Sequence, residues 1–134
     1  MNTPLHSPAP LGWLRFIPAI IWWLLSYGLL TLPGSKVPAY PWMEMLQVDK
    51  WVHIFLFAVL CCLFIWPFRY TTLSPANRLK WFWLITISAA CYGIAMEFVQ
   101  KYYVLNRAFE LGDILADIAG CTLALWLGKK YALQ

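Results

Sequence analysis

The chain has 134 residues, of which 62% are hydrophobic and only 12% are charged. Because a soluble domain usually carries about 25% charged residues, this composition excludes a water-soluble globular class and indicates an integral membrane protein. The formal net charge of +4 is more simply explained by anchoring to anionic lipid headgroups than by a nucleic-acid-binding surface.

Four apolar runs are long enough to span a membrane. A span needs roughly 20 mostly apolar residues, and its backbone hydrogen bonds must close within the segment, so each run is expected to be a helix. The sequence predicts a single domain over 1–134 of all-α class, a four-helix transmembrane bundle with helices at about 13–32, 51–68, 80–99 and 111–128. The first run is longer than the apolar core of a typical signal peptide, so we interpret it as a retained helix.

The charged residues divide between the two ends of this bundle. Four spans place both termini on one side, and six cations fall on that side: Arg15, Arg69, Arg78, Lys80, Lys129 and Lys130. The other side has four cations, Lys36, Lys50, Lys101 and Arg107, and all six carboxylates lie on it or nearest to it. The positive-inside rule therefore predicts a multi-pass protein of the inner (plasma) membrane with both termini in the cytoplasm.

The four cysteines, Cys61, Cys62, Cys91 and Cys121, all lie inside apolar runs, and none forms a CxxC pair. We interpret them as packing residues within helices and not as a disulfide framework.

The loop after the first run is rich in turn residues, and its segment 42–46 is a candidate short interfacial helix that would cover a site. The second helix then opens with Asp49, Lys50 and His53, and a spacing of four puts Asp49 and His53 on one face. Because an ionisable group about one turn inside a membrane is costly and usually functional, we favour a functional role for His53. A packed histidine that only bonds a neighbouring helix is the alternative.

The end of the third helix and the start of the fourth carry the other polar groups. Glu97 and Gln100 are three residues apart and share a face, as do Asp113 and Asp117, which are four apart. Two ionised acids at this depth require partners, and the candidates are Arg107, Lys50, His53 or a bound cation. Gly120, which follows Asp117 by about one turn, predicts the close approach of a neighbouring helix.

Hairpin topology brings these groups to the same end of the bundle. The second and fourth helices begin at the outer side and the third helix ends there, so the polar side chains converge at one membrane depth. We expect a polar pocket that opens toward the outer, extracytoplasmic interface. A buried network that only locks the helices together is the alternative.

The pattern Asp49-Lys50-x-x-His53, Glu97-x-x-Gln100 and Arg107-x5-Asp113-x3-Asp117-x2-Gly120 resembles the VanZ-like family of membrane proteins, which is named for a teicoplanin-resistance protein. The resemblance covers about 49–128. The family commonly has Asn at the position of Asp117, so this chain adds a negative charge there. The resemblance implies a role in the bacterial cell envelope, with a link to glycopeptide resistance, but it implies no particular reaction.

The first functional hypothesis is that the pocket binds or modifies an envelope lipid or a lipid-linked glycan. The candidate catalytic residues are His53, Glu97 and Asp49, with His53 paired to Asp49 or Glu97 as the acid–base group. The candidate substrate-binding residues are Lys50, Gln100, Arg107, Asp113 and Asp117, of which the cations would hold a phosphate or carboxylate. A divalent cation is a candidate cofactor, with Glu97, Asp113 and Asp117 as oxygen ligands.

Two other hypotheses use the same residues. A non-catalytic factor would bind glycopeptide or a cell-wall precursor without turnover, and a small transporter would use the acids as a proton or cation relay. The clustering of all acids in the outer half disfavours the transporter, because the inner half offers no continuation of the relay.

Overall fold

A computed structural model describes residues 12–134, and this part of the chain contains helices and no strand. The elements, in chain order, are η1 (Trp13–Phe16), α1 (Ile17–Leu30), η2 (Gly34–Lys36), α2 (Pro41–Met45), α3 (Val48–Ile65), η3 (Trp66–Tyr70), α4 (Pro75–Tyr103), α5 (Leu111–Leu127) and η4 (Gly128–Ala132), the last a π-helical turn. The all-helical prediction is confirmed, and α2 matches the short helix predicted for 42–46.

Four helical segments are long and apolar enough to cross a membrane, as predicted. They are Trp13–Leu30, Val48–Tyr70, Pro75–Tyr103 and Leu111–Ala132, with 18, 23, 29 and 22 residues. The third is longer than the predicted 80–99 because Ser74 caps its N-terminus: Asn77 N–H donates to Ser74 Oγ at 3.3 Å, and Pro75 occupies the first turn. At 1.5 Å per residue α4 is about 43 Å long, which exceeds the ~30 Å hydrocarbon core of a bilayer.

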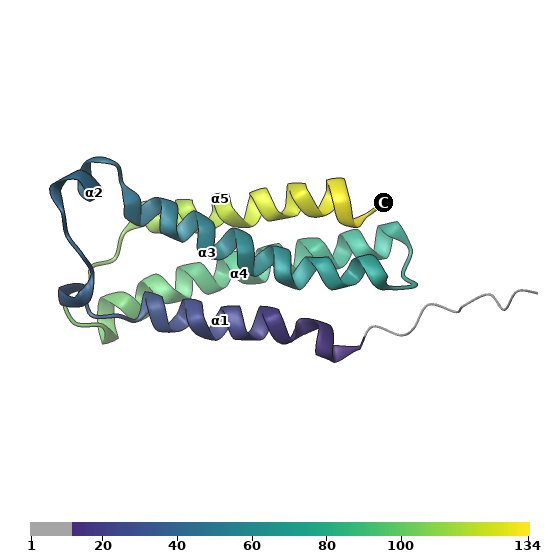
Figure 1. The fold of residues 1–134 in the computed structure, drawn as a ribbon, viewed down its shortest axis with the longest axis horizontal. Coiled ribbons are helices and arrows are strands. Elements are labelled where there is room, and N and C mark those ends of the chain that lie inside the picture. Colours follow the sequence, from purple (N-terminus) through teal and green to yellow (C-terminus); the bar gives the residue numbers. More distant parts are fainter. Residues whose placement is uncertain (1–11) are drawn as a thin grey trace, which may run out of the picture.

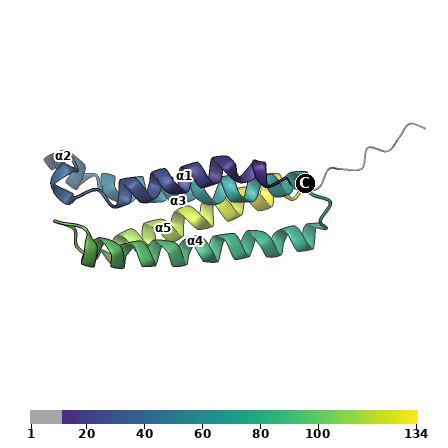
Figure 2. The same ribbon diagram turned by 90° about the horizontal axis from the view of Figure 1, so that it is seen from below.

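The four long segments run antiparallel to their neighbours in sequence (Figure 1). One end of the bundle, here called the polar end, holds α2, the start of α3 and the loop between α4 and α5. The opposite end, the basic end, holds the start of η1 and the C-terminus. The first eleven residues, for which a cytoplasmic position was predicted, lie outside the described part of the chain. Figure 2 shows α5 running obliquely between α4 and the layer formed by α1 and α3.

The α3–α5 pair packs closely because α5 presents a glycine to α3. A Cβ atom on Gly120 would collide with the carbonyl oxygen of Ile54 and would lie 3.0 Å from the backbone nitrogen of Ala58. The close approach predicted at Gly120 is therefore confirmed. This contact brings the first turns of α3 and α5, which carry most of the acids, beside each other.

The outward faces of the bundle are apolar. Leu24, Phe55, Ile87 and Leu115, one from each long segment, are all more than half exposed. Apolar faces of this extent on every long helix are suited to contact with lipid tails. Most of the buried polar side chains are instead gathered between the helices at the polar end: His53, Glu97, Gln100, Asp113 and Asp117. Arg78 is buried at the opposite end, where it donates to the carbonyl oxygen of Ala132.

Candidate functional site

Lys50 lies at the centre of a carboxylate cluster at the polar end. It belongs to the first turn of α3, and its Nζ donates to Asp113 Oδ1 and to Glu110 Oε2, both at 2.5 Å. A third, longer contact of 3.4 Å joins Nζ to Oδ2 of Asp49. One ammonium group thus contacts three carboxylates from two helix starts, which ties α3 to α5.

His53 lies one turn deeper and is only 2% exposed. Its Nδ1 is 2.8 Å from Asp117 Oδ1, and its Nε2 is 3.7 Å from Asp113 Oδ2. Because an ionised carboxylate can only accept, the ring donates its Nδ1–H to Asp117 and, when neutral, carries its lone pair on Nε2. Asp117 therefore fixes the orientation of the imidazole and leaves Nε2 as the reactive atom.

Glu97 lies beside this cluster and is completely buried. Its Oε2 accepts the backbone N–H of Glu110 at 2.8 Å, which attaches the end of the α4–α5 loop to α4. Within residues 12–134, Glu97 Oε1 and Asp117 Oδ2 have no hydrogen-bond partner. Buried polar atoms without a hydrogen-bond partner are uncommon in native proteins, so a water molecule, an ion or a ligand is expected beside them.

Gln100 and Arg107 make contacts of a different kind. Gln100 is 1% exposed, and its Nε2 donates to the carbonyl oxygen of Leu30 at 2.9 Å. This carbonyl belongs to the last turn of α1, whose acceptors have no partner within the helix. Arg107 Nε is 3.4 Å from the carbonyl oxygen of Leu32, in the loop after α1. Both side chains therefore hold the end of α1 against the polar end.

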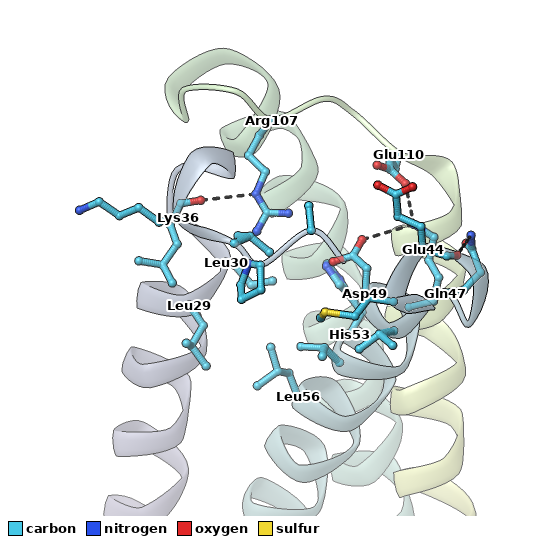
Figure 3. A pocket seen from close by; sticks show the side chains of 18 residues that line it. Leu29, Leu30, Lys36, Glu44, Gln47, Asp49, His53, Leu56, Arg107 and Glu110 are labelled. Atoms are coloured by element: carbon cyan, nitrogen blue, oxygen red, sulfur yellow. Dashed lines mark hydrogen bonds and ion pairs between the residues drawn. The ribbon is translucent and has the colours of Figure 1, made fainter. Parts of the chain in front are cut away.

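A cavity of about 400 Å³ opens beside the cluster. Its polar wall includes Lys36, Glu44, Asp49, Lys50, His53, Arg107 and Glu110, and its apolar wall includes Leu29, Leu30, Val52 and Leu56. Figure 3 shows Arg107 reaching over the cavity from its loop, and it shows Asp49 and His53 beside each other. Met43 and Glu44 of α2 also line it, so α2 covers the site as its sequence position indicated.

The structure brings together most of the predicted site residues but pairs them differently. Asp113 and Asp117 have the partners that burial requires, Lys50 and His53. His53 was expected to pair with Asp49 or Glu97. It bonds Asp117, an acid for which it was also a candidate partner, because the close α3–α5 packing places that acid against the ring. Four predicted site residues are buried and do not line the cavity: Glu97, Gln100, Asp113 and Asp117.

The possible metal ligands are also grouped differently from the predicted set of Glu97, Asp113 and Asp117. In residues 12–134, one set of ligand atoms, from Asp49, His53 and Asp113, has all members within 4.8 Å of one another. Asp113 is common to both sets. Asp117 contacts the histidine, which makes it a neighbour of the ligand set and not a member.

Sequence reasoning missed Glu110 as a site residue. Its carboxylate binds Lys50 and its backbone N–H binds Glu97, so it connects the two halves of the cluster. The sequence feature that could have identified Glu110 is its position immediately before Leu111, the first residue of α5, because an acid there stabilises the N-terminus of a helix.

This arrangement has two chemical capabilities. An imidazole that is oriented by a carboxylate and belongs to a residue lining the cavity can act as a general base or as a metal ligand. The guanidinium of Arg107, at the mouth of the same cavity, can form paired hydrogen bonds to a phosphate or carboxylate.

Comparison with known proteins gives one informative similarity. An uncharacterized protein of Schizosaccharomyces pombe is 36% identical to this chain over 83 residues, which are 62% of this chain and 48% of that protein. The chain thus spans about half the length of this relative. No family model matches the chain, and no solved structure matches it.

Proposed function

We propose that this chain is a VanZ-like membrane protein that binds the anionic headgroup of a membrane lipid or a lipid-linked glycan in the cavity at its polar end. The observation that carries the proposal is the lining of that cavity. Leucines of α1 and α3 form one part, and charged side chains of both signs lie at the other, among them Arg107, which forms no ion pair within residues 12–134. A lipid has the same division between an apolar chain and a charged headgroup.

Charge supports an anionic ligand at the mouth of the cavity. In the described part of the chain, neither Arg107 nor Lys36 forms an ion pair, although both line the cavity. Arg107 points over the cavity, whereas Lys36 points outward (Figure 3). Arg107 Nε contacts the Leu32 carbonyl, and no ion pair among the described residues involves its two Nη groups. A guanidinium over a partly apolar cavity is suited to a phosphate or carboxylate, because its planar fork matches two oxygens at once.

The motif supports the VanZ-like assignment, since Asp49, Lys50 and His53 recur here with the spacing that the resemblance requires. In that reading the polar end faces the extracytoplasmic side of the inner membrane. A lipid-linked cell-wall precursor would occupy the same cavity, which would account for a link to teicoplanin resistance.

The test compares two lipids that differ only in the headgroup. Phosphatidic acid and diacylglycerol with identical chains are offered to the purified protein in detergent, and bound lipid is counted by native mass spectrometry. We expect phosphatidic acid to bind at least about tenfold more tightly, a difference of about 1.4 kcal/mol. Equal binding of the two lipids would contradict the proposal.

The matched variants are Arg107→Gln and Arg69→Gln. Arg69 lies at the basic end, above the ring of Trp66, and is far from the cavity in the fold. Arg107→Gln should remove the preference for phosphatidic acid, and Arg69→Gln should retain it. If both variants bind like the original protein, the cavity is not the binding site.

A further inference from the structure

We infer that Asp49, His53 and Asp113 bind a divalent transition-metal ion, with Asp117 as the carboxylate that orients the histidine ligand. This inference goes beyond lipid binding and does not depend on it. It also replaces the ligand set expected from the sequence. The argument rests on the geometry of three ligands, on the partner of the histidine and on the balance of charge.

The three ligand groups are near enough to share one ion. Their ligand atoms lie within 4.8 Å of one another, and His53 Nε2 is 3.7 Å from Asp113 Oδ2. Neighbouring ligands on a metal with bonds of about 2.0–2.2 Å are separated by roughly 3–3.5 Å, so small side-chain rotations complete the site. The 3.7 Å separation is too long for a hydrogen bond, and no residue in 12–134 bonds to Nε2.

The other nitrogen of His53 has the partner that metal-bound histidines usually have. A ligating histidine typically donates its second N–H to a carboxylate or a carbonyl, which fixes the tautomer and strengthens the ligand. Asp117 Oδ1 accepts from Nδ1 at 2.8 Å, and both residues are at least 98% buried. A free Nε2 on a buried ring of fixed orientation, at the wall of a cavity, points to a ligand that is a Lewis acid.

The charges at this end also call for a cation. One ammonium group, that of Lys50, contacts the carboxylates of Asp49, Glu110 and Asp113. The other two acids at this end are buried and contact no Lys or Arg side chain of the described residues: Asp117 faces His53, and Glu97 accepts a backbone N–H. Buried acids without compensation are strongly unfavourable in a membrane protein. Lys50 binds Oδ1 of Asp113 and so leaves Oδ2 free toward His53.

One imidazole and two carboxylates suit Zn²⁺ or Mn²⁺ better than Ca²⁺ or Mg²⁺, which prefer oxygen ligands alone. Three protein ligands leave at least one position open, as in metal sites that bind an exchangeable ligand. Asp49 and His53 both line the cavity, so that open position is accessible to a molecule within it. A phosphate oxygen bound to Arg107 would be one such ligand.

The experiment uses the full chain, purified in detergent without a polyhistidine tag or added phospholipid. After incubation with Zn²⁺ and removal of the excess, we expect about one zinc per chain by elemental analysis. Substitution with Co²⁺ should give visible d–d absorption. A protein that retains no zinc in stoichiometric amount, or that gives no such absorption, would overturn the inference.

Asp49→Asn is the decisive variant, because the Asp49 side chain is 42% exposed and its loss should leave the fold intact. We expect it to weaken zinc binding at least tenfold, and Asp117→Asn to weaken it about 10–100-fold as for other outer-shell partners. Glu44→Gln removes an acid from the same cavity but not from the ligand set and should bind zinc normally. Equal loss in Asp49→Asn and Glu44→Gln would mean attraction to acidic groups in general and would refute the site.

The result is separable from lipid binding. Arg107→Gln should bind zinc like the original protein, since Arg107 is not a ligand, even though it should lose its preference for phosphatidic acid. Zinc binding without lipid binding would therefore reject only the proposed function, and lipid binding without zinc binding would reject only the metal site.

Discussion

Gly93 of α4 and Asp117 of α5 are in direct contact: a methyl group added to Gly93 would lie 2.5 Å from Asp117 Oδ2 and 3.0 Å from Asp117 Cβ. The absence of a side chain on α4 at this point creates the space for the buried acid. Since Asp117 holds His53 through Nδ1, the glycine indirectly positions the imidazole.

Gly93→Ala should therefore destabilise the protein by about 1–3 kcal/mol, as for other insertions into a packed interior. The matched control is Gly28→Ala, because a Cβ there meets nothing within 4 Å. Thermal unfolding in detergent, followed by tryptophan fluorescence, measures both. Equal unfolding midpoint temperatures for the two variants would contradict this expectation and show that α4 can move away from α5 without loss of stability.

Lys50→Met removes the ammonium that contacts three carboxylates, one of them on Asp113, whose side chain is only 4% exposed. Loss of one partner of a buried ion pair typically costs about 3–5 kcal/mol, because the other charge stays buried without compensation. We expect a large fall in stability in the presence of a chelator. Lys36→Met, at the rim of the same cavity, should change stability little.

The double variant Lys50→Met/Asp113→Asn tests whether that cost arises from the pair. It should be less destabilised than the sum of the single variants, with a coupling of about 1–3 kcal/mol in unfolding experiments. Additive effects would indicate that Lys50 stabilises the fold through its other two carboxylates.

Gln100→Leu should reduce stability rather than abolish lipid binding. Its amide satisfies the buried carbonyl of Leu30, and a carbonyl left unsatisfied costs about 1–3 kcal/mol. Gln47→Leu is the control, since the Gln47 amide makes an exposed bond to the Glu44 carbonyl. Normal stability with lost phosphatidic acid binding would reverse this assignment and make Gln100 a ligand-binding residue.

The orientation in the membrane is tested with single introduced cysteines. If the polar end is extracytoplasmic, Glu44→Cys should react with a membrane-impermeant maleimide in intact cells, and Lys129→Cys should react only after lysis. The native cysteines all lie within the long helices, so a background without them gives a clean signal. The reverse labelling pattern would invert the proposed topology.

The helices and the end at which the polar groups meet could be predicted from the sequence for a simple reason. The length of each apolar run defines a membrane span. Because successive spans alternate in direction, α3 and α5 begin at the end of the bundle where α4 ends. The helix ends were predicted less accurately. Helix α4 extends about one turn beyond the predicted range at each end, because Ser74 caps its N-terminus and because the helix continues past Gln100.

The sequence named Lys50 and His53 among the candidate partners of Asp113 and Asp117, but it could not assign the individual pairs, because these depend on helix rotation and on contacts of single atoms. Spacing put Asp49 and His53 on one face of α3, but it could not show that Asp117 of α5 takes the ring nitrogen. Spacing likewise could not distinguish a Gln100 that binds a ligand from one that caps the carbonyl of Leu30. Both outcomes depend on how closely α1 and α5 approach α3 and α4.

Helix α1 has few buried residues, and this has a consequence for how a lipid would reach the cavity. Only Ala19, Ser26 and Leu30 of its 14 residues are buried, and the indole of Trp22 bonds the Leu56 carbonyl at 3.0 Å. Because Leu29 and Leu30 of α1 form part of the apolar wall, an outward displacement of this end of α1, with loss of the Gln100–Leu30 hydrogen bond, would open the cavity toward the acyl chains. A lipid already dissolved in the bilayer would then reach the headgroup site directly from the acyl-chain region, without crossing water.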